Sequence, residues 1–247
     1  MTLFDQRVFD LRILIVLIGF MSLIWGCAQL SRNLAADEYR DIESDLLRFE
    51  MFSPVVSTGL LTQTSTHNLT ACDLHGQRAL LLLEMPLAET ALRTGAAGDF
   101  DRHIKLIESR ARETLACAPR DSLVWLILFA VEVLHGRLGP QTFDLLTMSY
   151  STSPNEAWVS LRRIIGAIPV ALSAPEPVRE RILADFSSLI RNGYLDIPAT
   201  VYLRSSTPVR TLLQAEIEKL PSYNRKKFMD ALDKARSRGF VPSRDRD

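Results

Sequence analysis

The sequence has few cysteines, no excess of either charge and none of the common catalytic motifs. Three cysteines in 247 residues are too few for a disulfide-built scaffold. Lys+Arg and Asp+Glu both total 29, so no basic surface is expected for nucleic acid, which needs one to bind phosphates. The G-x-S-x-G, H-E-x-x-H, G-x-G-x-x-G and P-loop patterns are all absent. We therefore predict no catalytic residue, no cofactor and no nucleic-acid partner.

Two residue pairs have the spacing of metal ligands, but each is only half of the set that a metal site needs. Glu132 and His135 are three residues apart, as in carboxylate-bridged metal bundles, but those bundles use the motif twice. Cys72 and His75 supply half of a zinc site, and no second half follows at a suitable spacing. No metal site is predicted.

Short alternating runs of Val and Ile are also missing, which argues against an all-β fold. What is present is helical. In residues 123–134 only Glu132 is polar, so this segment has no face to offer to water. Twelve residues at ~1.5 Å each reach only ~18 Å, well short of the ~30 Å hydrocarbon layer of a bilayer. We predict a buried central helix of a helical domain.

Other helices are predicted before and after it, with a break at Pro86 and a capping box formed by Ser153 and Glu156. Their ranges are 77–94, 100–117, 142–150, 156–168, 178–191, 209–220 and 223–238.

The N-terminus carries one long apolar run. Residues 13–30 contain no charge, which is near the lower length limit for a membrane-spanning helix. Arg7 and Arg12 precede the run and favour a cytoplasmic N-terminus, with the body exported. We predict a single transmembrane anchor. A cleaved signal peptide is an alternative, although no A-x-A site follows. A lipoprotein signal is another, because Gly26 precedes Cys27, the residue that would be lipidated.

These features divide the chain into four parts. Residues 1–32 are the anchor or signal sequence, and residues 33–71 are a charged juxtamembrane helix followed by a Ser/Thr-rich linker. Residues 72–240 are the helical domain, and residues 241–247 are a disordered tail.

Two segments of the helical domain are alike. Pro119 and Pro154 are 35 residues apart, and Trp125 and Trp158 are 33 apart, with each proline just before a helix that bears the tryptophan. This spacing resembles the tetratricopeptide repeat, whose period is ~34 residues. The resemblance covers residues 77–172 and implies antiparallel helical hairpins stacked as an α-solenoid. In that family small residues face the tryptophan and a proline closes the unit, places that fit Ala111, Ala116 and Pro119.

The second unit departs from the family. It lacks the usual glycine after Trp158, and Leu145 and Met148 are large where small residues are expected. A plain helical bundle is the alternative, and both alternatives are all-α.

Cys72 and Cys117 flank two helices of nearly equal length, joined by a tight turn. In such an antiparallel pair the start of the first helix lies beside the end of the second. The two cysteines are then neighbours, and in an oxidising periplasm they form a disulfide, or else they are two small buried side chains. A Cα separation above ~7 Å would exclude the bridge.

A stack of helical hairpins has an extended concave surface suited to binding proteins. Arg162, Arg163 and Arg179 are predicted to form a basic patch on it, and Tyr150 and Asn155 to lie in a contact loop. The alternative for the arginines is a solvated helix face.

The first functional hypothesis is thus a protein-binding scaffold held in the bacterial inner membrane, with its body in the periplasm, for secretion or surface-polysaccharide assembly. The alternatives are an enzyme that modifies an envelope polymer at an acidic site and a structural bitopic subunit of a membrane complex.

Overall fold

The computed structural model describes residues 3–50, 52–63 and 69–237, and within the first helix it describes the side chains of residues 13–27, 37 and 39–47. These residues form helices and no strand, which confirms the all-α class. The elements are α1 (Leu3–Leu47), α2 (Pro54–Thr62), α3 (Leu74–Thr94), α4 (Ala97–Cys117), α5 (Ser122–Leu134), α6 (Pro140–Thr152), α7 (Ala157–Ala167), the 3-10 helix η2 (Ile168–Ser173), α8 (Glu176–Arg191), α9 (Asp196–Arg204), α10 (Thr207–Glu218) and α11 (Ser222–Ser237).

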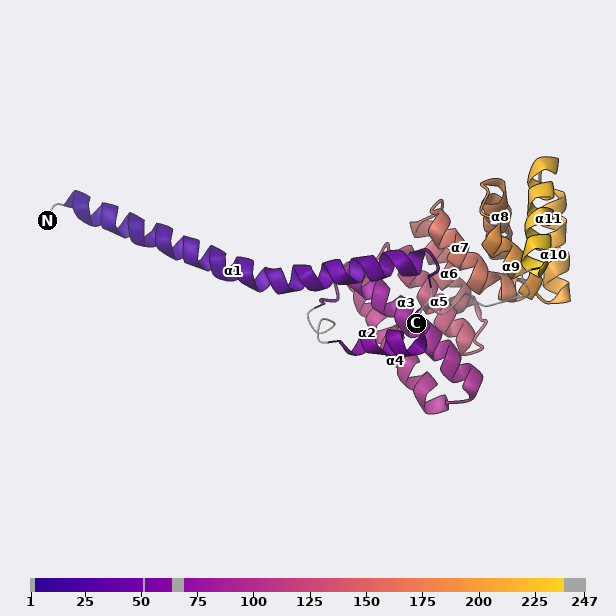
Figure 1. Cartoon of the computed structure of the whole chain (residues 1–247), viewed down its shortest axis with the longest axis horizontal. Helices are drawn as coiled ribbons and strands as arrows, with labels where there is room; N and C mark the ends of the chain where they lie inside the picture. Colours follow the sequence, from indigo (N-terminus) through magenta and orange to yellow (C-terminus); the bar gives the residue numbers. More distant parts are fainter. Residues whose placement is uncertain (1–2, 51, 64–68, 238–247) are drawn as a thin grey trace.

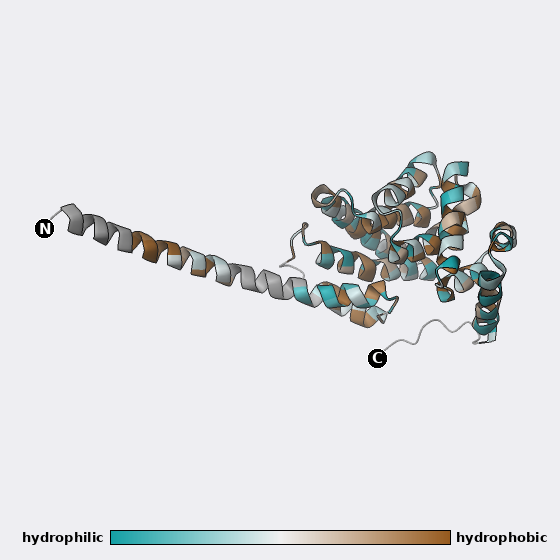
Figure 2. Ribbon diagram, turned by 90° about the horizontal axis from the view of Figure 1, so that it is seen from above, coloured by the Kyte–Doolittle hydropathy of each residue, from teal (hydrophilic) through white to brown (hydrophobic). Residues whose placement is uncertain are grey.

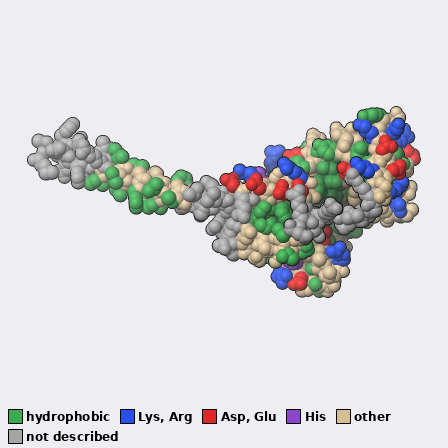
Figure 3. All heavy atoms as spheres, viewed as in Figure 1, with side chains coloured by type: hydrophobic (Ala, Val, Ile, Leu, Met, Phe, Trp, Pro, Cys, Tyr) green, Lys and Arg blue, Asp and Glu red, His purple; other side chains and the backbone are tan. Residues whose placement is uncertain are grey.

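Helix α1 is a single rod of 45 residues that extends far beyond the body (Figure 1). The sequence predicted an anchor over 13–30 and a separate charged juxtamembrane helix after residue 33. No proline or glycine lies between the two, and the backbone continues from one into the other without a break. Side chains 13–27 are exposed, and Figure 3 shows hydrophobic side chains along the part of the rod where side chains are described. Within the part of the chain that the structure describes, no helix is long and apolar enough to cross a membrane.

Helix α2 replaces part of the predicted Ser/Thr-rich linker. Ser53 accepts a hydrogen bond from the backbone N–H of Val56, and Pro54 occupies the first turn, so this segment has a regular helix start. The buried Tyr39 of α1 donates its hydroxyl to the carbonyl of Leu60 at 2.9 Å. The helix therefore belongs to the body, and the boundary predicted at residue 72 separates segments that pack together.

The core begins with the α3–α4 hairpin and continues through α5 and α6. Gly95, with φ of 73°, ends α3 in the left-handed conformation and allows the tight turn into α4. Helix α5 is the predicted central helix, and it is buried as expected; Leu123, Val124, Phe129 and Val131 are at most 1% exposed. Figure 2 shows the alternation of hydrophobic and hydrophilic residues along the helices of the body.

Three local predictions are wrong. Pro86 lies inside α3 without ending it. The capping box does not form, because α7 begins at Ala157 with Glu156 as its N-cap and without a side-chain cap. Helix α9, which follows α8, was not predicted, because its nine residues are too short for a clear apolar period.

Consecutive helices pack as pairs, α3 with α4, α5 with α6 and α7 with α8. The two tryptophans of the repeat-like segments lie on α5 and α7 and pack, partly buried, against one hydrophobic core. A pairwise arrangement is common to helical bundles and solenoids, so the repeat architecture stays a prediction.

Candidate functional site

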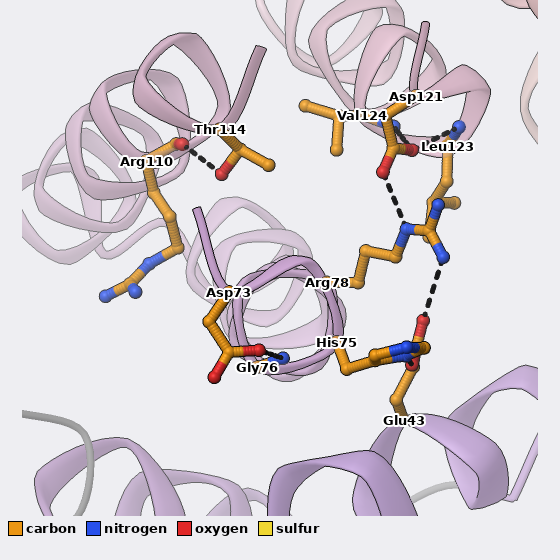
Figure 4. A network of polar contacts seen from close by, with 10 residues as sticks. All are labelled: Glu43, Asp73, His75, Gly76, Arg78, Arg110, Thr114, Asp121, Leu123 and Val124. Carbon is orange, nitrogen blue, oxygen red and sulfur yellow. Dashed lines mark hydrogen bonds and ion pairs between the residues drawn. The ribbon is translucent and has the colours of Figure 1, made fainter. Parts of the chain in front are cut away.

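Arg78 on α3 connects three helices near the base of the projecting rod (Figure 4). Its Nε atom donates to Asp121 Oδ2 at 2.7 Å, and its Nη1 atom donates to Glu43 Oε1 at 3.3 Å. Glu43 belongs to α1 and is 3% exposed, and Asp121 caps α5 and is 4% exposed. His75, one turn before Arg78, places Nδ1 2.5 Å from Glu43 Oε2. We call Glu43, His75, Arg78 and Asp121 the clamp.

The two carboxylates of the clamp are buried, whereas Arg78 and His75 are partly exposed. Burial opposes the charge of Arg78, but the neighbouring carboxylates of Asp121 and Glu43 outweigh burial and raise the pKa of Arg78. Asp121 also accepts from the backbone N–H groups of Leu123 and Val124, at 3.1 and 3.2 Å, and so caps α5. One arginine therefore links the start of the central helix to the end of the rod.

A second arginine holds the very end of α1. Arg162 of α7 donates Nη2 to the carbonyl of Leu46, and its guanidinium lies 4.7 Å from the centre of the Phe49 ring. Phe49 has φ of 64°, a left-handed conformation that turns the chain away after α1. Burial lowers the pKa of Arg162 to about 10. Arg162 was expected on a partner-binding patch, and the structure places it at the end of the rod instead.

Replacing Arg78 with methionine is expected to lower the free energy of unfolding by about 2 kcal/mol. Two buried carboxylates lose their arginine, but Glu43 keeps His75 and Asp121 keeps two backbone N–H donors. Arg78 itself is 21% exposed, so the loss is smaller than the ~3–5 kcal/mol of a fully buried pair. Urea denaturation measures the total effect. Hydrogen exchange of residues 39–47 should rise more than exchange in α8.

Arg40→Met is the control, because Arg40 lies on α1, one turn before Glu43, and among the described residues it pairs with Asp37 alone, in an exposed i, i+3 contact. This variant should change stability by less than about 0.5 kcal/mol. Equal effects of the two variants would contradict the role given to the clamp.

Cys72 and Cys117 lie beside the clamp, just before α3 and at the end of α4. The structure joins them by a disulfide, with the Cα atoms 5.3 Å apart, inside the range that a bridge requires. Both residues are exposed. Gln77, on the next turn of α3, donates to the Thr70 carbonyl at 2.7 Å and accepts from Arg110 at 2.8 Å. The bridge thus closes the end of the hairpin to which the rod is attached.

The other residues predicted to bind a partner do not form an exposed patch, although the Arg163 guanidinium lies 4.6 Å from the centre of the Tyr150 ring. Arg163 is 0% exposed, and Tyr150 is 6% exposed in the last turns of α6 rather than in a loop. Arg179 is partly buried and pairs with Glu176 and the Ala174 carbonyl. Only Asn155 lies exposed between helices as expected. The sequence pattern does not distinguish an arginine on a solvated face from one that satisfies interior carbonyls, so the predicted basic patch is not assembled.

Arg163 instead organises a buried polar cluster that includes Asp185, a residue that the sequence did not single out. The Arg163 Nε atom donates to Ser149 Oγ at 3.0 Å, and the Arg163 Nη2 atom donates to the carbonyls of Ser149 and Ser153 at 2.7 and 2.6 Å. Its Nη1 lies 3.6 Å from Asp185 Oδ2. Ser160 donates to Asp185 Oδ1 at 3.0 Å. Burial raises the pKa of Asp185, against the opposing effect of Arg163.

Asp185 and Ser160 line a cavity of about 170 Å³ between α7 and α8. The remaining lining residues are Pro154, Asn155, Ala157, Ser188, Leu189, Asn192 and Tyr194.

A separate groove of about 220 Å³ lies over α4, α5 and α6. Leu115, Trp125 and Leu128 contribute apolar surface, and the Trp125 indole donates to the Pro119 carbonyl at 2.8 Å. The two carboxylates in this groove both pair with Arg137: Glu132 at 2.6 Å and Glu108 at 4.0 Å. His135, which the sequence pairs with Glu132 as half of a metal motif, packs edge-on against the ring of Phe100.

Cys27, the candidate lipidation site, is exposed on α1. Comparison of the chain with protein-family models, curated proteins and solved structures returned no match.

Proposed function

We propose that this chain is a membrane-tethered helical protein whose body binds another protein in the bacterial cell envelope. The observation that carries the proposal is the continuity of α1: an exposed apolar segment, residues 13–27, runs without a break into a helix end that is clamped to the body. Contiguous exposed apolar surface marks a contact with lipid or protein. The charge-free sequence continues to residue 30, within the ~17–25 residues that an anchor needs.

The charge at the two ends of this segment supports one orientation. Arg7 and Arg12 precede it, which favours a cytoplasmic N-terminus and an exported body. An exposed disulfide in the body is typical of an oxidising compartment such as the periplasm. Both observations fit a single-pass inner-membrane protein.

A rigid connection between anchor and body sets the height and direction of the body above the bilayer. Tyr39, Glu43 and the carbonyl of Leu46 each contact a different part of the body, α2, α3 and α7. Such a stalk suits a scaffold that presents a surface to a partner at a defined place. The bitopic-subunit alternative uses the same segment against other membrane helices.

We expect Leu17→Lys/Met21→Lys to abolish membrane binding. Each charge near the centre of an embedded helix costs about 2.5–3.5 kcal/mol. Both residues are exposed, at 55% and 66%, so the changes leave the body intact. Flotation of the full chain with phosphatidylcholine vesicles measures the binding.

The control is Val55→Lys/Leu92→Lys, which places the same charges at exposed apolar residues of the body, 82% and 46% exposed. This variant should float with the vesicles as the original chain does. If the chain fails to float, or if the two variants float equally, the tether is not residues 13–27.

Protein binding is tested by photocrosslinking in intact cells from exposed positions on the body: Leu106, Leu172 and Tyr223. A discrete protein adduct from at least one position supports the scaffold. Lipid adducts alone, or no adduct from any of the three, contradict it.

A further inference from the structure

The cavity between α7 and α8 has the chemistry of a small binding site. Six of its nine lining residues carry hydrogen-bonding side chains: Asn155, Ser160, Asp185, Ser188, Asn192 and Tyr194. None of the nine is Lys or Arg, so the lining offers no charge for an anion. The other three, Pro154, Ala157 and Leu189, give the wall small apolar surfaces.

The Asp185 carboxylate in the cavity wall is held in place by neighbouring side chains. Asp185 is 9% exposed, and Ser160 fixes its Oδ1 from the neighbouring helix. Arg163 lies behind it, with Nη1 3.6 Å from Oδ2, and supplies the compensating positive charge from the interior. Because Oδ2 is buried, Oδ1 is the oxygen left to accept a hydrogen bond from a ligand, and a carboxylate whose charge is compensated from the interior does not require a cationic ligand.

The exposed lining residues Asn155, Asn192 and Tyr194 form the rim of the cavity, and they have hydrogen-bonding groups available to a ligand. Asn155 is exposed and its side chain makes no hydrogen bond with the described residues. The side-chain amide nitrogen of Asn192 donates to Ser188, and the side-chain oxygen of Asn192 remains as an acceptor. Tyr194 is 45% exposed and lines the cavity, and its side chain combines an apolar ring with a hydroxyl. Ligand sites combine apolar walls and a few fixed polar groups in this manner.

We infer that this cavity binds a single sugar ring of a neutral saccharide. A pyranose has hydroxyl groups that both donate and accept, which match Asp185, Asn155 and Asn192, and an apolar C–H face, which matches the ring of Tyr194. The volume of about 170 Å³ is below the ~300–1,000 Å³ of cavities for larger ligands, so it suits one ring and not a buried chain. The site is independent of the membrane tether, since no residue of α1 lines it.

The test is saturation-transfer NMR on the full chain, kept in a detergent without a sugar headgroup. The probes are methyl α-glucopyranoside, methyl β-galactopyranoside and methyl β-N-acetylglucosaminide, with ethylammonium and acetate as probes of the two charged classes. At least one glycoside should show transfer to its ring protons. Transfer to ethylammonium or acetate without any glycoside would overturn the ligand class.

Two variants at the rim locate the site. Asn155→Ala and Tyr194→Ala should each weaken the glycoside about fivefold, the equivalent of one lost contact. Both positions are exposed, so the fold is kept, and thermal denaturation verifies this. Leu106→Ala is the control, because Leu106 is 47% exposed on α4, a helix that contributes no lining residue to the cavity. No glycoside binding, or binding that is unchanged by both rim variants, overturns the inference.

Discussion

Replacing Arg163 with methionine is expected to lower the free energy of unfolding by about 3–5 kcal/mol, the range for removing one partner of a fully buried charged pair. Arg163 is 0% exposed and donates to Ser149 Oγ and to the carbonyls of Ser149 and Ser153. Methionine fills much of the space but donates nothing. The Ser153 carbonyl then loses the donor that Arg163 supplies, and the buried Asp185 carboxylate keeps the Ser160 hydroxyl but loses its compensating charge. Urea denaturation followed by circular dichroism gives the change.

Arg181→Met is the control for this prediction. Arg163 and Arg181 both approach the ring of Tyr150, at 4.6 and 5.9 Å from the ring centre. Arg181 lies on α8 and is exposed, and it makes no buried hydrogen bond with the described residues. Its replacement should cost less than about 0.5 kcal/mol. The double variant Arg163→Met/Asp185→Asn should recover part of the loss, because the amide removes the unpaired charge. A strictly additive double variant would show that Arg163 and Asp185 do not interact.

Reduction of the Cys72–Cys117 bridge is expected to lower the free energy of unfolding by about 4 kcal/mol. The two residues are separated by 45 positions, and closing a loop of that length removes this much conformational freedom from the unfolded chain in the chain-entropy treatment. Denaturation of the same protein with and without a thiol reductant measures it. The variant Cys72→Ser/Cys117→Ser should have the stability of the reduced chain.

Cys27→Ser serves as the control, because Cys27 lies outside the bridge. This variant should respond to the reductant as the original chain does. If peptide mass analysis of the protein isolated from its own envelope finds Cys72 and Cys117 as free thiols, or if the reductant leaves the denaturation midpoint unchanged, the bridge does not stabilise the body.

The accuracy of the sequence predictions follows the length and apolar character of each segment. The stretch 123–134 is apolar on every side, and no arrangement other than burial suits it in a helical body. The segment 100–117 carries an apolar stripe with helical spacing, and α4 matches it closely. Helices α2 and α9 have nine residues each, and over so few positions a helical period is not distinguishable from a loop.

The clamp and the Arg163–Asp185 pair were not predicted from the sequence, for a different reason. Glu43, Arg78 and Asp121 are separated by 35 and 43 residues, and nothing in their local sequences sets them apart from solvated charges. The same holds for Arg163 and Asp185, where only the packing of α7 on α8 decides that the pair is buried. Adjacent in the sequence, Arg162 and Arg163 have different partners because a helix turns by about 100° between them.

The sequence by itself determined that this protein is helical, that one apolar helix lies at its centre and that its N-terminal segment is free of charge for 18 residues. These properties depend on the period and the composition of contiguous residues, which the chain carries locally. Tertiary structure alone decided that the N-terminal helix is one rod, which arginines attach it to the body and which carboxylate lines the cavity. Those properties depend on which distant side chains are excluded from water together, and that is settled only when the helices pack.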